Sequence, residues 1–155
     1  MRYTQECRRA ANHLSDLLDS RLCSSDLEAL AADLSAPVGE RSWTRLVCTE
    51  DSDAWLIAWG EASEVGVHDH GGSHGAIRVL RGLLVEEYRK PGPRLSRRQW
   101  RRREIRPGQS IEIPPAHIHS VSNPGPVPAL SLHVYSPPLE QMNFFPPAGR
   151  VEVGV

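Results

Sequence analysis

Short β-like runs follow one another from residue 42 nearly to the C-terminus, and they restrict the chain to a β-rich core. Glycine, proline and aspartate separate the runs and no helix signal lies between them, so each run predicts a strand. We expect nine strands, at Ser42–Thr49, Ala54–Ala62, Val65–His70, Gly75–Leu80, Leu83–Tyr88, Arg98–Ile105, Ser110–Ile113, His117–Ser122 and Ala129–Tyr135. Many short strands at this spacing are typical of an antiparallel sandwich or barrel.

The segment before these strands has a different pattern. Residues 3–34 predict two helices, because leucines recur there at helical spacing. The second helix opens on Ser25–Glu28, which has the pattern of a capping box. We expect one domain over residues 1–155, with a helical cover at 1–38 and a β core at 42–145.

Composition excludes several classes of protein. The net charge of −1 gives no electrostatic reason for a polyanionic partner. The three cysteines are widely spaced and form no Cys-x-x-Cys pair, which argues against a disulfide scaffold or a thiolate zinc site. No apolar run approaches the length of a membrane span. We therefore expect a cytoplasmic monomer without a nucleic-acid or membrane partner.

One segment is unusually basic, with seven arginines between Arg94 and Arg106. A nucleic-acid surface is one interpretation, but Trp100 is the only aromatic residue available for stacking there. We favour a solvated basic sheet edge, because charges along an edge also discourage the addition of another strand.

His68 and His70 are two residues apart, so in extended chain both imidazoles lie on one face. Such a pair suits neighbouring positions on one metal ion, although surface or hydrogen-bonded histidines would give the same pattern. His117 and His119 form a second pair, which a small barrel could bring to the same interior point. Three imidazole ligands that leave other coordination positions of the ion open suit divalent iron, zinc, copper or nickel. Spacing alone does not choose between His117 and His119.

The spacing of Gly108, Pro114, His119 and Asn123 resembles the second cupin motif, which selects His119. The first histidine pair with its following glycine is similar to the first cupin motif. The glutamate of that motif, normally a fourth ligand, falls at Gly75. The resemblance implies a cupin-type double-stranded β-helix, a jelly-roll barrel, with the two N-terminal helices packed on it.

The missing glutamate and the run from Ser131 to Pro138 together resemble the cysteine dioxygenase family. Arg45 in Trp-Thr-Arg and Trp59 in Trp-Gly-Glu fit the same family, and the resemblance covers about residues 42–145. It implies ferrous iron, Fe(2+), bound by three residues: His68, His70 and His119. It also implies a catalytic hydrogen-bonded series, which consists of Ser131, His133 and Tyr135. Their alternate spacing places all three on one face of a strand.

The resemblance assigns further roles around the substrate. Arg45 binds the substrate carboxylate through two parallel hydrogen bonds, and Trp59 and Met142 line the apolar part of the pocket. The Ser136–Pro137 peptide is expected to be cis. Gly75 also stands where many animal members have a cysteine that crosslinks to the tyrosine, so Tyr135 should remain an unmodified phenol.

The expected activity is the oxidation of L-cysteine by dioxygen to cysteine sulfinic acid. One alternative is a dioxygenase of another small thiol acid, 3-mercaptopropionate, although such relatives tend to have glutamine at the position of Arg45. Another is a metal-binding cupin sensor without turnover, which would not need the series that ends at Tyr135. A zinc or nickel isomerase-type cupin would usually be expected to use the glutamate that is Gly75 here.

Overall fold

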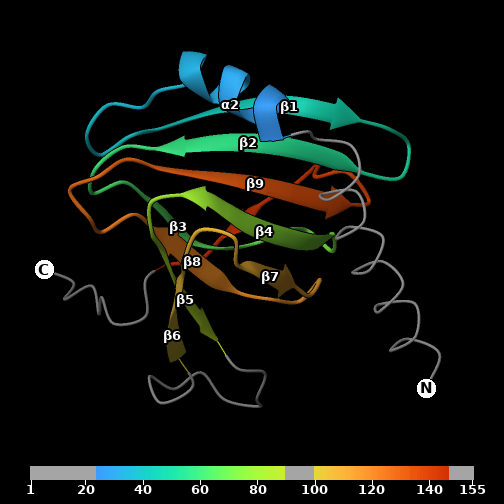
Figure 1. Cartoon of the computed structure of the whole chain (residues 1–155). Coiled ribbons are helices and arrows are strands. Elements are labelled where there is room, and N and C mark those ends of the chain that lie inside the picture. The colour runs from blue at the N-terminus through green and yellow to red at the C-terminus, as the bar shows by residue number, and fades with distance from the viewer. Residues whose placement is uncertain (1–23, 90–99, 147–155) are drawn as a thin grey trace, which may run out of the picture.

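The computed structural model describes residues 24–89 and 100–146, which form two antiparallel sheets that face each other (Figure 1). The first sheet contains, in spatial order, β1 (Arg41–Cys48), β2 (Asp53–Trp59), β9 (Ala129–Ser136), β4 (His74–Arg81) and β7 (Ser110–Ile113). The second contains β10 (Asn143–Phe144), β3 (Glu64–Asp69), β8 (His119–Ser122), β5 (Leu84–Arg89) and β6 (Trp100–Ile105). Each strand pair within the sheets is antiparallel.

All nine expected strands are present, with ends that differ by a few residues from the prediction. The short strand β10 was not predicted. The expectation of a barrel is wrong in one respect: the two sheets are not closed on each other, because hydrogen bonding ends at β1 and β7 in one sheet and at β10 and β6 in the other. The observed arrangement is an open pair of sheets of the jelly-roll kind.

The described part of the chain contains one helix, α2 (Ser24–Asp33), and not the expected pair. The other predicted helix lies outside the described residues. Leu27 and Ala31 of α2 pack on Leu56 and Leu130, so the helix covers the face of the first sheet that is turned away from the second (Figure 1). Within the described ranges, no helix has the length and apolar character needed to cross a membrane.

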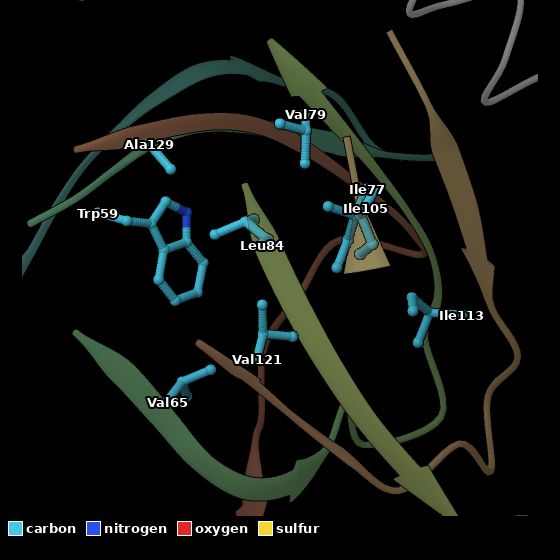
Figure 2. Packing of buried hydrophobic residues seen from close by; sticks show 9 residues of the cluster. All are labelled: Trp59, Val65, Ile77, Val79, Leu84, Ile105, Ile113, Val121 and Ala129. Carbon is cyan, nitrogen blue, oxygen red and sulfur yellow. The ribbon is translucent and has the colours of Figure 1, made fainter. Parts of the chain in front are cut away.

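The main hydrophobic core fills one part of the space between the sheets (Figure 2). It takes side chains from nearly every strand: Trp59, Val65, Ile77, Val79, Leu84, Ile105, Ile113, Val121 and Ala129. These are alternate residues of their strands, which point inward because successive side chains lie on opposite faces. The cavity described below adjoins this core, since Trp59, Val65, Ile77 and Val121 belong to the core and also line the cavity.

Candidate metal centre

Three buried histidines meet on the inner face of the second sheet. His68 on β3 lies directly opposite His119 on β8, and His70 follows just beyond the end of β3. Each is at most 3% exposed. One ring nitrogen from each residue can be chosen so that all three lie within 4.8 Å of one another. The structure thus brings together the three residues that the sequence predicted as metal ligands.

Hydrogen bonds determine which nitrogen atoms two of these rings present. Nδ1 of His68 donates to the carbonyl oxygen of Gly66 over 2.7 Å, and Nδ1 of His119 donates to Oε1 of Glu86 over 2.8 Å. Each ring therefore keeps an Nε2 lone pair. Nε2 of His119 is buried and has no hydrogen-bond partner among the described residues. A buried polar atom without a partner is costly, and a metal ion would satisfy it.

The histidines are also in the protonation state that metal binding requires. Burial, followed by the charge of His119, lowers the pKa of His68 to about 4. Burial likewise lowers the pKa of His70 and of His119 from the ordinary value. Neutral imidazoles are the ligating form. The donor set fits a divalent transition-metal ion, because three neutral nitrogen ligands suit that class of ion.

Glu86 on β5 supports His119 from behind. Its Oε1 atom accepts hydrogen bonds from His119 and from Nε2 of His117, each over 2.8 Å, and its Oε2 atom accepts one from Arg103. Burial alone would raise the pKa of Glu86, but these hydrogen bonds outweigh burial and hold the pKa well below its ordinary value. His117 thus contacts the carboxylate and is not part of the group formed by His68, His70 and His119.

Glu86, His117 and His119 form a second group of ligand-type residues. Their polar atoms already bond to one another, and the guanidinium of Arg103 adjoins the carboxylate. We interpret this group as a support for His119, since a neighbouring cation disfavours a metal ion there.

The loop after His70 is fastened to the C-terminal part of the described chain. Asp69 Oδ1 accepts hydrogen bonds from the Gly71 amide and from the Asn143 side chain. Gly71 has a φ of 60°, and a Cβ atom there would lie 2.9 Å from the Gln141 carbonyl oxygen. Glycine is therefore required where the two segments touch, and β10 is held beside the histidines.

The histidines open onto a cavity of about 460 Å³ between the sheets. Tyr135 and His133 line the cavity, and so do Trp59 and Met142. Arg45 is different: its side chain is exposed, lies with its guanidinium carbon 5.4 Å from the centre of a Trp55 ring, and is not among the lining residues. The arginine that lines the cavity is Arg41.

A chain of four buried side chains ends at this cavity. The indole nitrogen of Trp59 donates to Ser131 Oγ over 2.8 Å, Ser131 Oγ lies 2.8 Å from His133 Nε2, and His133 Nδ1 lies 3.2 Å from the Tyr135 hydroxyl. An indole nitrogen can only donate, so Ser131 accepts from Trp59. Ser131 is fully buried, and His133 Nε2 is the acceptor within reach of its own hydroxyl proton, so we infer that Ser131 donates to His133. His133 then carries its proton on Nδ1 and donates to Tyr135, whose own proton is free for the cavity.

Burial keeps both ends of this series, His133 and Tyr135, in their neutral forms. Burial lowers the pKa of His133 to about 3, so its imidazole is neutral, with one donor and one acceptor. Burial and the charge of Asp53 raise the pKa of Tyr135 above its ordinary value, which keeps the phenol protonated. Gly75 lies directly opposite Tyr135. A Cβ atom at Gly75 would lie 3.0 Å from Cε1 of the tyrosine ring, so the glycine leaves room for that ring.

Sequence reasoning missed three parts of the site. Arg41 lies four residues before Arg45, on the same face of the strand, and belongs to no motif that would distinguish it. Glu86 stands in the run Leu84–Arg89 without a distinguishing pattern, although a carboxylate is a common hydrogen-bond partner of a ligand histidine. The segment 139–144 forms a cavity wall, but only two of its residues form a strand, too few to give a periodic signal. The Ser136–Pro137 peptide is cis, as predicted.

Comparison with solved structures defines the class of fold. A protein with a double-stranded β-helix domain from Klebsiella pneumoniae matches with a TM-score of 0.58 at 20% identity, over 80% of this chain and 96% of that chain. A cupin superfamily protein from Desulfitobacterium hafniense matches with a TM-score of 0.56 at 15% identity, over 69% and 86% of the two chains. At these identities the likeness concerns the fold alone, and the chain has a cupin-like fold.

Sequence comparison narrows the class to a family. A family model for cysteine dioxygenase type I matches residues 29–147. Cysteine dioxygenase type 1 from Rattus norvegicus is 32% identical over 94 residues, which are 58% of this chain and 47% of the relative. The chain therefore belongs to the cysteine dioxygenase type I family. It spans about half the length of the curated relatives that it matches.

Proposed function

We propose that the protein is a thiol dioxygenase that binds ferrous iron through His68, His70 and His119 and oxidises L-cysteine to cysteine sulfinic acid. Both atoms of dioxygen join the thiol sulfur, so the reaction needs no external reductant. One observation carries the proposal: three neutral imidazoles face the same cavity as a phenol whose proton is directed there by the chain from Trp59. Membership of the cysteine dioxygenase type I family supports it.

Bound ferrous iron would supply ligation of the substrate thiolate and the activation of dioxygen. The three histidines contribute no charge, so the ion keeps its full double positive charge and favours an anionic ligand. The cavity between the sheets is lined largely by apolar and aromatic side chains, which limit the access of water to the reacting sulfur. The site is thus suited to a small anionic thiol.

Tyr135 donates its hydroxyl proton toward the substrate and orients the reacting groups by hydrogen bonding. His133 fixes the tyrosine, and Ser131 and Trp59 fix the histidine, so the donor is held in place before the substrate arrives. The raised pKa of Tyr135 keeps this proton in place at neutral pH.

The test is oxygen uptake by protein loaded anaerobically with Fe(II), measured with L-cysteine and 3-mercaptopropionate in parallel, with products identified by mass. We expect L-cysteine to gain two oxygen atoms at much the higher kcat/KM. A preference for 3-mercaptopropionate would keep the dioxygenase chemistry and replace the substrate. No uptake with either thiol by iron-loaded protein would refute the enzyme proposal in favour of a binding protein.

A further inference from the structure

The buried indole that begins the series to Tyr135 contacts a cation. The guanidinium carbon of Arg41 lies over the Trp59 ring, 5.4 Å from the ring centre, and the two residues are directly opposite each other on β1 and β2. Trp59 is 1% exposed, whereas Arg41 is only partly buried. Arg41 therefore extends the series outward, to the edge strand of the first sheet.

A second aromatic ring also holds this guanidinium. Trp43, two residues further along β1, has its ring centre 5.8 Å from the same guanidinium carbon and is 57% exposed. Tryptophan gives the strongest cation–π contacts, and such contacts strengthen where the cation is shielded from water. Among the described residues no carboxylate forms an ion pair with Arg41, so we attribute the position of its guanidinium to the two rings.

The contact with Arg41 affects the hydrogen bond that Trp59 donates. Nε1 of Trp59 donates to Ser131 Oγ over 2.8 Å, and a rotation of the indole ring would break this bond. A cation over the ring restricts such a rotation. It also draws electron density from the indole, which makes the N–H group a stronger donor, and hydrogen bonds in a chain polarise one another. Arg41 thus acts on both the orientation and the strength of the first bond in the series.

Arg45 provides a comparison on the same strand. Its guanidinium carbon also lies 5.4 Å from the centre of a tryptophan ring, that of Trp55, which is directly opposite it on β2. Nε1 of Trp55 is buried and has no hydrogen-bond partner among the described residues. The two arginine contacts are thus alike in geometry, but of the two it is the contact of Arg41 that leads to Tyr135.

We propose that Arg41 is a positioning residue of the site, which holds Trp59 and through it directs the hydroxyl proton of Tyr135 into the cavity. The inference rests on the proposed function, because it is the thiol dioxygenase reaction that uses this proton. Arg41 acts here through Trp59 and is assigned no contact with the substrate. Its removal should therefore disturb the series even in protein that holds no thiol.

The first experiment follows the indole N–H group of Trp59 by NMR in the isotopically labelled full chain, loaded with Zn(II). Zinc is diamagnetic and suits the same histidine ligands. The rate of hydrogen exchange at Nε1 reports how often its bond to Ser131 opens. The variants are Arg41→Met, which keeps an apolar contact with the ring, and Arg41→Lys, which keeps the charge. Arg45→Met is the matched control, and the Trp59 signal is identified by its absence in Trp59→Phe.

We expect Arg41→Met to speed exchange at Trp59 by about 2- to 30-fold, the range that the strength of a cation–π contact implies. Arg41→Lys should recover part of this change, and Arg45→Met should alter the signal of Trp55 but not that of Trp59. Trp43→Ala removes an exposed ring, so it tests the same contact if Arg41→Met does not fold, with a smaller expected increase. Exchange at Trp59 that is unchanged in the folded variants at Arg41 and Trp43 would overturn the inference.

The second experiment is a double-mutant cycle on oxygen uptake by the Fe(II)-loaded protein with L-cysteine. Arg41→Met should lower kcat by about 2- to 10-fold, no more than Tyr135→Phe does, with a smaller change in KM. In the Tyr135→Phe background the same change should alter kcat by less than about 2-fold, because a residue that acts through the tyrosine then has nothing left to act on. Arg102→Ala, which removes an exposed charge from β6, is the control.

An unchanged kcat in Arg41→Met would overturn the inference. So would a loss that is equally large in Tyr135→Phe, or a loss confined to KM, which would indicate direct contact with the substrate. A wild-type protein that consumes no oxygen would refute the proposed function, whereas the exchange measurement at Trp59 would still decide whether Arg41 holds the series.

Discussion

Replacement of Glu86 by glutamine tests how the protein fixes its candidate metal ligand. In the structure one oxygen of Glu86 accepts protons from His117 and His119, and the other accepts one from Arg103. A carboxylate therefore requires that Nδ1 of His119 carry the proton and that Nε2 keep its lone pair for the cavity. Glutamine has nearly the same shape but only one accepting oxygen.

The amide group of glutamine must face either the two histidines or Arg103, and in both orientations a donor opposes a donor. One buried unsatisfied donor costs about 1–3 kcal/mol of folding free energy. If the amide faces His119, that ring can place its proton on Nε2 and lose its ligating lone pair. Loss of such a supporting partner typically lowers metal affinity by about 10- to 100-fold, and we expect Glu86→Gln to fall in this range.

The assay is anaerobic competition for Fe(II) between the protein and a chromophoric chelator, with urea unfolding of the metal-free protein measured separately. Glu87→Gln is the matched control, because Glu87 is the next residue of β5 and its side chain is exposed. A folded Glu86→Gln protein that binds Fe(II) as tightly as Glu87→Gln would refute the assigned role of Glu86. A loss of stability without a loss of affinity would show that the network supports folding only.

Three further results are expected from the same structure. Tyr135→Phe should keep the fold and lower kcat by about 10-fold, the value of one hydrogen bond of ~1.4 kcal/mol, and unchanged steady-state turnover would exclude its donor role. Gly75→Ala should lower stability by about 1–3 kcal/mol through overpacking, since its Cβ would lie 3.0 Å from the tyrosine ring, whereas Gly66→Ala meets open space and should leave the thermal midpoint unchanged. Finally, acid should destabilise the metal-free protein, because the pKa values of His68 and His133 fall from 6.5 to about 4 and about 3. Below about pH 6.5 the unfolded chain binds these protons while the folded chain does not. The free energy of unfolding should therefore fall by up to ~1.4 kcal/mol per pH unit for each imidazole between pH 6.5 and 4, and it should be constant above pH 7. A free energy of unfolding by urea that does not change between pH 6.5 and 4 would contradict this prediction.

Much of the fold could be predicted because it depends on local pattern. The strands are short β-like runs separated by glycine, proline or aspartate, so their positions follow from the residues themselves. The pairing of His68 with His119 depends on strand register across distant parts of the chain. Only the motif resemblance, and not the spacing, chose His119 over His117.

The parts that could not be predicted depend on side-chain direction at longer range. Arg41 and Arg45 share a strand face, and the sequence gives no sign that one side chain enters the cavity while the other remains exposed. Strand β10 is only two residues long and is held by the bond between Asn143 and Asp69, which no periodicity reveals. The series Ser131, His133 and Tyr135 was predicted, but its direction depends on Trp59, which was predicted only as a lining residue.

The position of Glu86 explains one arginine of the basic strand and the charge of the site. A carboxylate bonded directly to the ion would cancel half of its double charge, whereas Glu86 lies behind His119 and bonds to its far nitrogen. Arg103, from the arginine-rich segment, pairs with this buried carboxylate, so at least one of those arginines has a structural role. With Glu86 compensated in this way, the three neutral histidines and Arg41 leave the cavity electropositive once a divalent ion binds. Such a cavity would favour a ligand with two negative groups, as a thiolate with a carboxylate has.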